Sequence, residues 1–184
     1  MPYLFCNIAW MDEYRGDNEA AQMQGGGAYV DANHHGNEAC NFYSVGGVCY
    51  GYVRVPGRIG IDRFGVDRDA DRANDITVVW VARHPQERET LVVGWYLHAT
   101  VYRNPREFEF QNNIYEENDI QTYRISAEQH DTVLLPVHER NLRIPRGNGG
   151  FGQSNIWYAD GYLGEQTVAD VDNFIINYHG GHQI

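Results

Sequence analysis

The residues best suited to binding chemistry lie together at positions 143–158, which read RIPRGNGGFGQSNIWY. Arg143 and Arg146 offer planar guanidinium groups that pair well with phosphate or carboxylate. Glycines between and after them let a backbone approach a ligand closely. Two side-chain amides, a hydroxyl and an aromatic ring follow, which can hydrogen-bond and stack: Gln153, Ser154, Asn155 and Trp157. This segment has the parts needed to hold a nucleotide.

The glycines of this segment match the GxGxxG pattern through Gly147, Gly149 and Gly152. In a dinucleotide-binding fold, such a pattern follows a strand and opens a helix. Here a polar and aromatic stretch follows, so the sequence argues against that fold. Two interpretations stay open, a surface turn rich in glycine and a loop that clamps a nucleotide, with Arg143 or Arg146 near phosphate.

Two aromatic residues outside the segment are also candidates for a pocket. Trp10 ends the first expected strand, and Tyr29 sits beside the glycine triplet at 25–27. Such rings can sandwich an extruded base, which proteins recognise by stacking and by hydrogen bonds to its Watson–Crick edge. Trp80 and Trp95 lie inside expected strands, where core packing is the ordinary explanation.

The chain shows no catalytic motif. It has no GxSxG elbow and no histidine–asparagine–histidine nuclease core, and a nuclease motif that ends in lysine is impossible because the chain contains no lysine. We therefore expect a domain without catalytic residues.

Metal sites are not expected either, nor is a cofactor. The aspartates at 67, 69 and 71 imitate the opening of a calcium loop, but Arg72 stands where that loop needs glycine. His34, His35 and Cys40 lack a fourth ligand at zinc-site spacing.

Composition limits the class of partner. The chain has 184 residues, which fits one domain over positions 1–184. Its net charge is −11, and all 14 basic residues are arginine. Such acidity argues against tight nonspecific binding to a polyanion but leaves room for a local pocket lined by arginine. No membrane-spanning run is present, and three scattered cysteines favour the reducing cytoplasm.

Strand signals dominate the rest of the chain. Stretches rich in β-branched and aromatic residues, bounded by turn formers, predict strands at 3–10, 39–43, 48–55, 76–82, 91–102, 121–125 and 132–135. Gly46-Gly47 predicts a hairpin turn. A helix is expected from a cap at Thr167 to a stop at Gly180, and a short one at 17–23. The expected fold class is α+β, with a β-rich curved sheet or small barrel flanked by a few helices.

The chain also resembles a known family. The stretches that carry the resemblance are YLFCNIAWMDEYRG, GGGAYV, GNEACNF, CYGYVRV, VVGWYLHATVYR and IPRGNGGFGQSNIWYA. They resemble the amino-terminal reader domain of modification-dependent restriction enzymes that carry an HNH endonuclease domain, a domain similar to the EVE, YTH and PUA-like superfamily. The resemblance covers nearly the whole chain. It implies a PUA-like fold and matches these site positions: Trp10, Tyr29, Asn41, Arg146, Gln153, Ser154, Asn155 and Trp157.

The function that the resemblance implies is recognition of a modified base in double-stranded DNA. A modified cytosine would be flipped into an aromatic pocket, and the domain would target a fused or partner HNH nuclease. The resemblance implies that positions 1–184 are this reader domain alone or a fragment of a longer endonuclease. Two other functions stay open: an RNA-binding PUA-like module, and an enzyme or sensor for a small anionic nucleotide.

Overall fold

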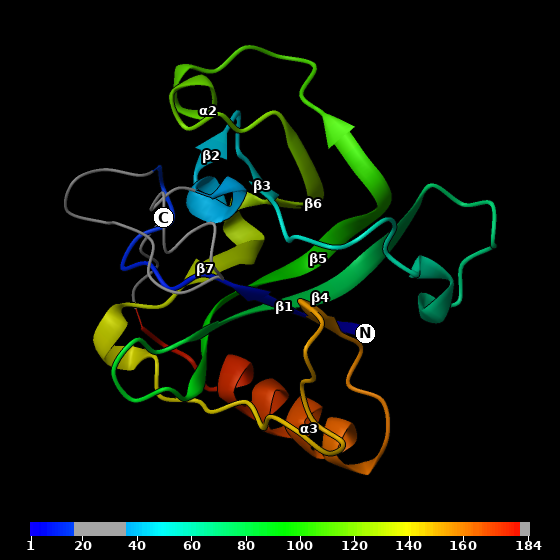
Figure 1. The fold of residues 1–184 in the computed structure, drawn as a ribbon, viewed down its shortest axis with the longest axis vertical. Coiled ribbons are helices and arrows are strands. Elements are labelled where there is room, and N and C mark those ends of the chain that lie inside the picture. The colour runs from blue at the N-terminus through cyan, green and yellow to red at the C-terminus, as the bar shows by residue number, and fades with distance from the viewer. Residues whose placement is uncertain (17–35, 181–184) are drawn as a thin grey trace.

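A single mixed sheet dominates the computed structural model, which describes residues 1–16 and 36–180 (Figure 1). The sheet has eight strands. Seven of them lie in the order β2-β3-β6-β5-β4-β1-β8, and the eighth, β7, pairs with β5. The strands are β1 (Tyr3–Ile8), β2 (Ser44–Val45), β3 (Val48–Gly51), β4 (Arg72–Arg83), β5 (Thr90–Glu107), β6 (Thr122–Glu128), β7 (Thr132–Leu134) and β8 (Ile156–Trp157). The α+β class is confirmed. The sheet is not closed into a barrel, so of the two expected forms only the curved sheet is compatible.

The centre of the sheet is buried on both faces. β1 runs parallel to β4, which pairs with the antiparallel β5. Side chains of β4 alternate, so that Val78 and Trp80 pack into one apolar cluster while Val79 and Val81 pack into another. This explains why the strand reads as an almost continuous apolar run, as is typical when both faces of a strand are covered.

One long helix, α3 (Tyr162–Ile176), covers the face that carries Phe5 and Trp95, at the bottom of Figure 1. The expected helix exists, but it begins five residues before Thr167. Gly161 occupies the N-cap position, and the Thr167 hydroxyl instead donates to the Leu163 carbonyl oxygen at 2.7 Å. The predicted cap was wrong because threonine inside a helix can satisfy its hydroxyl on the preceding turn.

The remaining elements correct two further expectations. The hairpin at Gly46-Gly47 is confirmed, since β2 and β3 pair across it. The strand predicted at 39–43 is wrong, because a 3₁₀ helix at Asn37–Cys40 and a turn occupy this stretch. The predicted helix at 17–23 lies outside the described residues. The other helical elements are α2 (Asn113–Glu117) and 3₁₀ turns at Ile61–Phe64, Gln129–Asp131 and Val137–Glu139.

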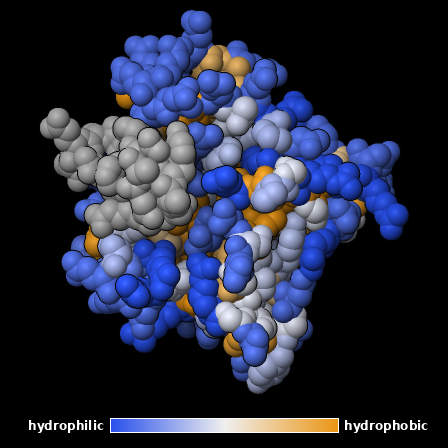
Figure 2. Space-filling view, in the orientation of Figure 1, coloured by the Kyte–Doolittle hydropathy of each residue, from blue (hydrophilic) through white to orange (hydrophobic). Residues whose placement is uncertain are grey.

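No helix in residues 1–16 and 36–180 is long and apolar enough to cross a membrane. Most of the face seen in Figure 2 is hydrophilic, with small apolar areas between polar side chains.

Candidate functional site

The segment singled out from the sequence lies against the sheet at both of its ends. Its first part pairs with the start of β5, where Leu91 and Arg143 form an antiparallel bridge. Its last part becomes β8, which pairs with β1. Because β1 and β4 are parallel, their carboxyl ends meet at the sheet edge that the segment crosses. The fold therefore brings the segment beside residues distant in sequence.

A tight turn forms the middle of the segment. The Phe151 amide donates to the Pro145 carbonyl oxygen at 2.9 Å, and the Gly150 amide donates to the Gly147 carbonyl oxygen at 2.9 Å. A Cβ atom at Gly150 would lie 2.5 Å from the Pro145 carbonyl oxygen, so only glycine fits there. The glycines thus have a definite role in closing the turn.

Arg146 holds this turn on the sheet. Its Nε donates to the Thr90 hydroxyl at 2.8 Å and its Nη1 to the Gly152 carbonyl oxygen at 3.1 Å, while Nη2 bonds the Asn7 side-chain oxygen. The guanidinium carbon also lies 4.7 Å from the centre of the Phe151 ring. Three of its five N–H groups are therefore committed to protein acceptors, and two remain.

A second arginine lies close to the first. Desolvation lowers the pKa of the Arg146 guanidinium, and the positive charge of Arg83 lowers it further. Arg83 is exposed and donates through Nε to the Arg88 carbonyl oxygen at 3.1 Å. Two mutually repelling cations at the ends of β1 and β4 favour an anion beside them.

The polar residues that follow the turn connect the region of Arg146 and Arg83 to the loop after β3. The Asn155 carbonyl oxygen accepts from the Asn7 amide at 2.8 Å, and its side-chain amide donates to the Arg54 carbonyl oxygen at 2.9 Å. Gln153 and Ser154 are exposed. The Ser154 hydroxyl accepts from the Ile156 amide at 3.2 Å, whereas the Gln153 side chain makes no hydrogen bond within the described residues.

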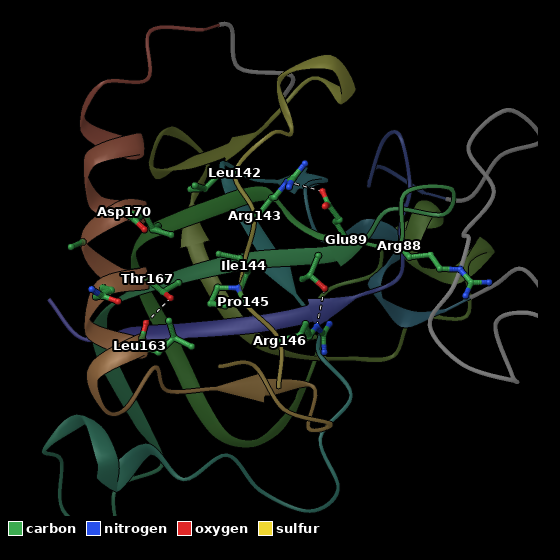
Figure 3. Close-up of a pocket in the computed structure, with 14 residues that line it drawn as sticks. Arg88, Glu89, Leu142, Arg143, Ile144, Pro145, Arg146, Leu163, Thr167 and Asp170 are labelled. Carbon is green, nitrogen blue, oxygen red and sulfur yellow. Dashed lines mark hydrogen bonds and ion pairs between the residues drawn. The ribbon is translucent and has the colours of Figure 1, made fainter. Parts of the chain in front are cut away.

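A cavity of about 730 Å³ opens between α3 and the first part of the segment (Figure 3). Arg143 and Arg146 both line it, and Leu163 and Ile144 contribute apolar wall. Arg143 is 72% exposed and its Nε lies 2.7 Å from Glu89 Oε2. Figure 3 shows the side chain of Arg88, at the rim, extending away from α3.

We use the name arginine rim for four exposed arginines that lie in the segment and in the strand end and loops beside it, apart from Arg146 within the turn. They are Arg54, Arg83, Arg88 and Arg143. Sequence inspection missed the first three and also Asn7 and Thr90. Asn7 carried a signal, since it is the one side-chain amide in the strand YLFCNI.

The two tryptophans proposed from the sequence do not meet in one pocket. Trp157 is half-buried, with its ring 5.2 Å from Phe5 and 5.9 Å from Phe151. Trp10 is 4% exposed and packs in the core cluster of the other sheet face, with the Arg140 guanidinium carbon 5.0 Å from its ring centre. Among residues 1–16 and 36–180, no aromatic side chain lines the cavity beside α3.

Asn41 is also brought elsewhere. It is fully buried, and it accepts from the Tyr52 amide at 2.8 Å and donates to the Tyr52 carbonyl oxygen at 3.0 Å. This pair of bonds ties the 3₁₀ helix region to the end of β3. Tyr29, the remaining predicted site residue, lies outside the described residues, as do His34 and His35.

Within the described chain, no group of three or more His, Cys, Asp or Glu side chains could hold a metal ion. Comparison of the chain with protein-family models, with curated proteins and with solved structures gives no match.

Proposed function

We propose that this chain is a non-catalytic recognition domain for a modified cytosine in double-stranded DNA, and that the duplex approaches the arginine rim. The observation that carries the proposal is the group of arginines in and beside the glycine turn. On a chain with a net charge of −11, Arg83 at the end of β4 lies close enough to Arg146 of the turn to lower its pKa. Arg143 precedes the turn in the same segment, and the Arg54 carbonyl oxygen accepts from the Asn155 side chain just after it.

The arginines differ in how many hydrogen bonds they already make, and this difference supports a contact with backbone phosphates. Arg146 is fixed by three hydrogen bonds and positions the turn, whereas Arg83 and Arg54 keep their terminal nitrogens free of side-chain acceptors within the described residues. Phosphate contacts fix the register of a protein on a duplex and carry no base information themselves. In this proposal Gln153 and Ser154 supply hydrogen bonds to the base edge, and Trp157 supplies apolar surface nearby.

Two parts of the proposal rest on the family resemblance: the flipping of the base and the partnership with a nuclease. A flipped base needs an aromatic or apolar pocket, and the proposal assigns this role to the region around the turn. It also assigns the cleavage to a fused or partner HNH domain. The three cysteines are free and buried, which fits the cytoplasmic location that we propose.

A second candidate is a free anionic nucleotide in the cavity beside α3. A volume of about 730 Å³ falls in the range of small-molecule sites, and Arg143 and Arg146 line it. The acidity of the whole chain also opposes a long polyanion more than a small anion.

Fluorescence anisotropy with three duplexes tests the proposal. The duplexes differ only in one cytosine, which is unmodified, 5-methylated or 5-hydroxymethylated. We expect one modified duplex to bind at least about tenfold more tightly, which corresponds to about 1.4 kcal/mol. The double variant Arg54→Gln/Arg83→Gln should weaken all three duplexes, whereas Arg72→Gln, an exposed arginine at the other end of β4, serves as the matched control.

Equal, weak binding of all three duplexes would overturn the proposal. Preference for single-stranded RNA of the same sequence would instead indicate the RNA-binding alternative. Thermal stabilisation by free mononucleotides, lost in Arg143→Gln, would indicate the second candidate.

A further inference from the structure

A second cavity, of about 400 Å³, lies at the opposite end of the molecule, between the end of β5, α2 and the start of β6. Figure 1 shows α2 and α3 at opposite ends of the view, and Figure 2 shows a small apolar area among hydrophilic residues in the region of α2. The proposed function does not use this cavity.

The wall of the cavity is aromatic. Phe108 stacks on Tyr115 with ring centres 4.5 Å apart and planes at 17°, and Phe110 lies 5.3 Å from Phe108. The two phenylalanines are half-buried, while Tyr115 is 3% exposed. Asn112 caps α2 by accepting from the Tyr115 amide at 3.3 Å, so the buried ring has a fixed backbone position.

The rim of the cavity is acidic. Residues 107–121 contain five carboxylates and no basic residue. Glu107 and Glu116 line the cavity, are exposed, and pair with no cation in the described part of the chain. The nearby Arg106 is directed elsewhere, with Nη1 3.9 Å from Asp71 and its guanidinium carbon 5.6 Å from the Tyr102 ring.

We propose that this cavity binds an arginine side chain from a basic segment of a partner protein. A guanidinium stacks flat on an aromatic ring and forms two parallel hydrogen bonds with a carboxylate, so it suits a cavity lined by Phe108 and Phe110 together with Glu107 and Glu116. A lysine ammonium is more strongly hydrated and lacks the flat face. The same carboxylates repel phosphate, so the cavity is separate in charge and place from the arginine rim.

A titration of the ¹⁵N-labelled full chain with three capped peptides tests the proposal. The peptides are acetyl-GRGRG-amide, acetyl-GKGKG-amide and acetyl-GQGQG-amide. We expect shifts confined to amides of residues 107–122, with the arginine peptide bound most tightly. Glu107→Gln/Glu116→Gln should weaken it by about fivefold or more, since charge complementarity provides much of the attraction.

Two variants separate binding from folding. Glu165→Gln removes an exposed carboxylate on α3 and should leave the affinity unchanged. Phe110→Leu keeps an apolar side chain but loses the ring, and should lower the preference for arginine over lysine. The proposal is overturned if the glutamine peptide binds equally well, if the shifts map outside residues 107–122, or if the double glutamine variant binds like the parent.

Discussion

Arg146 links the glycine turn to two strands, since its three N–H donors reach Thr90 at the start of β5, Asn7 on β1 and the Gly152 carbonyl oxygen. Only a forked guanidinium has donors in this arrangement. The residue therefore positions the turn, and a ligand would meet its two remaining N–H groups.

Replacing Arg146 by lysine should loosen the turn. Lysine keeps the positive charge but cannot reach three separate acceptors, so we expect the free energy of unfolding to fall by about 1–2 kcal/mol. Urea denaturation measures this change. Arg143→Lys is the control, because an exposed ion pair contributes less than about 1 kcal/mol. Equal losses in both variants would contradict the positioning role.

Glu38 introduces a pH dependence near the arginine rim. Desolvation raises the pKa of its carboxyl from 4.5 to about 7, and the charge of Arg54 partly opposes this rise. Below pH 4.5 both folded and unfolded chains carry the proton, so there is no penalty. As the pH rises toward 7, the unfolded chain loses the proton first and the folded state becomes less stable.

Glu38→Gln should remove this decrease in the free energy of unfolding between pH 4.5 and 7. The variant should melt at a higher temperature than the parent at pH 8, and the difference should shrink to nothing below pH 4.5. Melting curves by circular dichroism across this range provide the measurement. A constant difference at every pH would show that Glu38 does not titrate between the two states as described.

Residue types in the sequence identified the segment but not the role of every side chain. Arg143 and Arg146 were found through their neighbours and do line one cavity. Trp10 and Asn41 are buried away from the segment by tertiary packing, which no local sequence pattern reveals. Arg54 and Arg83 escaped notice because each stands alone in the sequence. Arg83 comes near the segment because β4 pairs with β1, and Arg54 because the loop after β3 hydrogen-bonds Asn155.

At the scale of elements, strands with strong apolar patterns were predictable and context-dependent ones were not. The patterns of β1, β4 and β5 follow from burial on both faces. The stretch at 39–43 also reads as apolar and aromatic, yet Asn41 turns inward to bond the Tyr52 backbone and favours a turn. β8 is too short to leave a pattern, since it consists of Ile156 and Trp157.

The packing of β5 against its neighbours predicts that a side chain at Gly94 would strongly destabilise the fold. A Cβ atom there would lie 2.3 Å from the Val133 carbonyl oxygen and 2.6 Å from the Phe42 ring. Gly94→Ala should therefore destabilise the fold by about 1–3 kcal/mol or more, because backbone of β7 must move. Gly152→Ala, where nothing lies within 4 Å, should change the free energy of unfolding by less than about 0.5 kcal/mol. A loss of stability in Gly94→Ala as small as that in Gly152→Ala would contradict this prediction and show that the β7 backbone shifts at little cost.

At the scale of the whole molecule, charge is divided between the arginine rim and an acidic remainder. The net charge of −11 limits how many phosphates the surface can approach. If four rim arginines make the contacts, the logarithm of the affinity should fall against the logarithm of salt concentration with a slope no steeper than about −4. Anisotropy titrations from low to physiological salt measure this slope. A steeper one would require a larger basic surface than the rim.

Hydrogen–deuterium exchange of the full chain, with and without the preferred modified duplex, tests the central claim most directly. We predict that bound DNA protects amides in residues 147–155, 52–58 and 83–90, which surround the arginine rim, and leaves residues 107–122 unchanged. Protection confined to residues 107–122, or bound DNA without protection around the turn, would contradict the account.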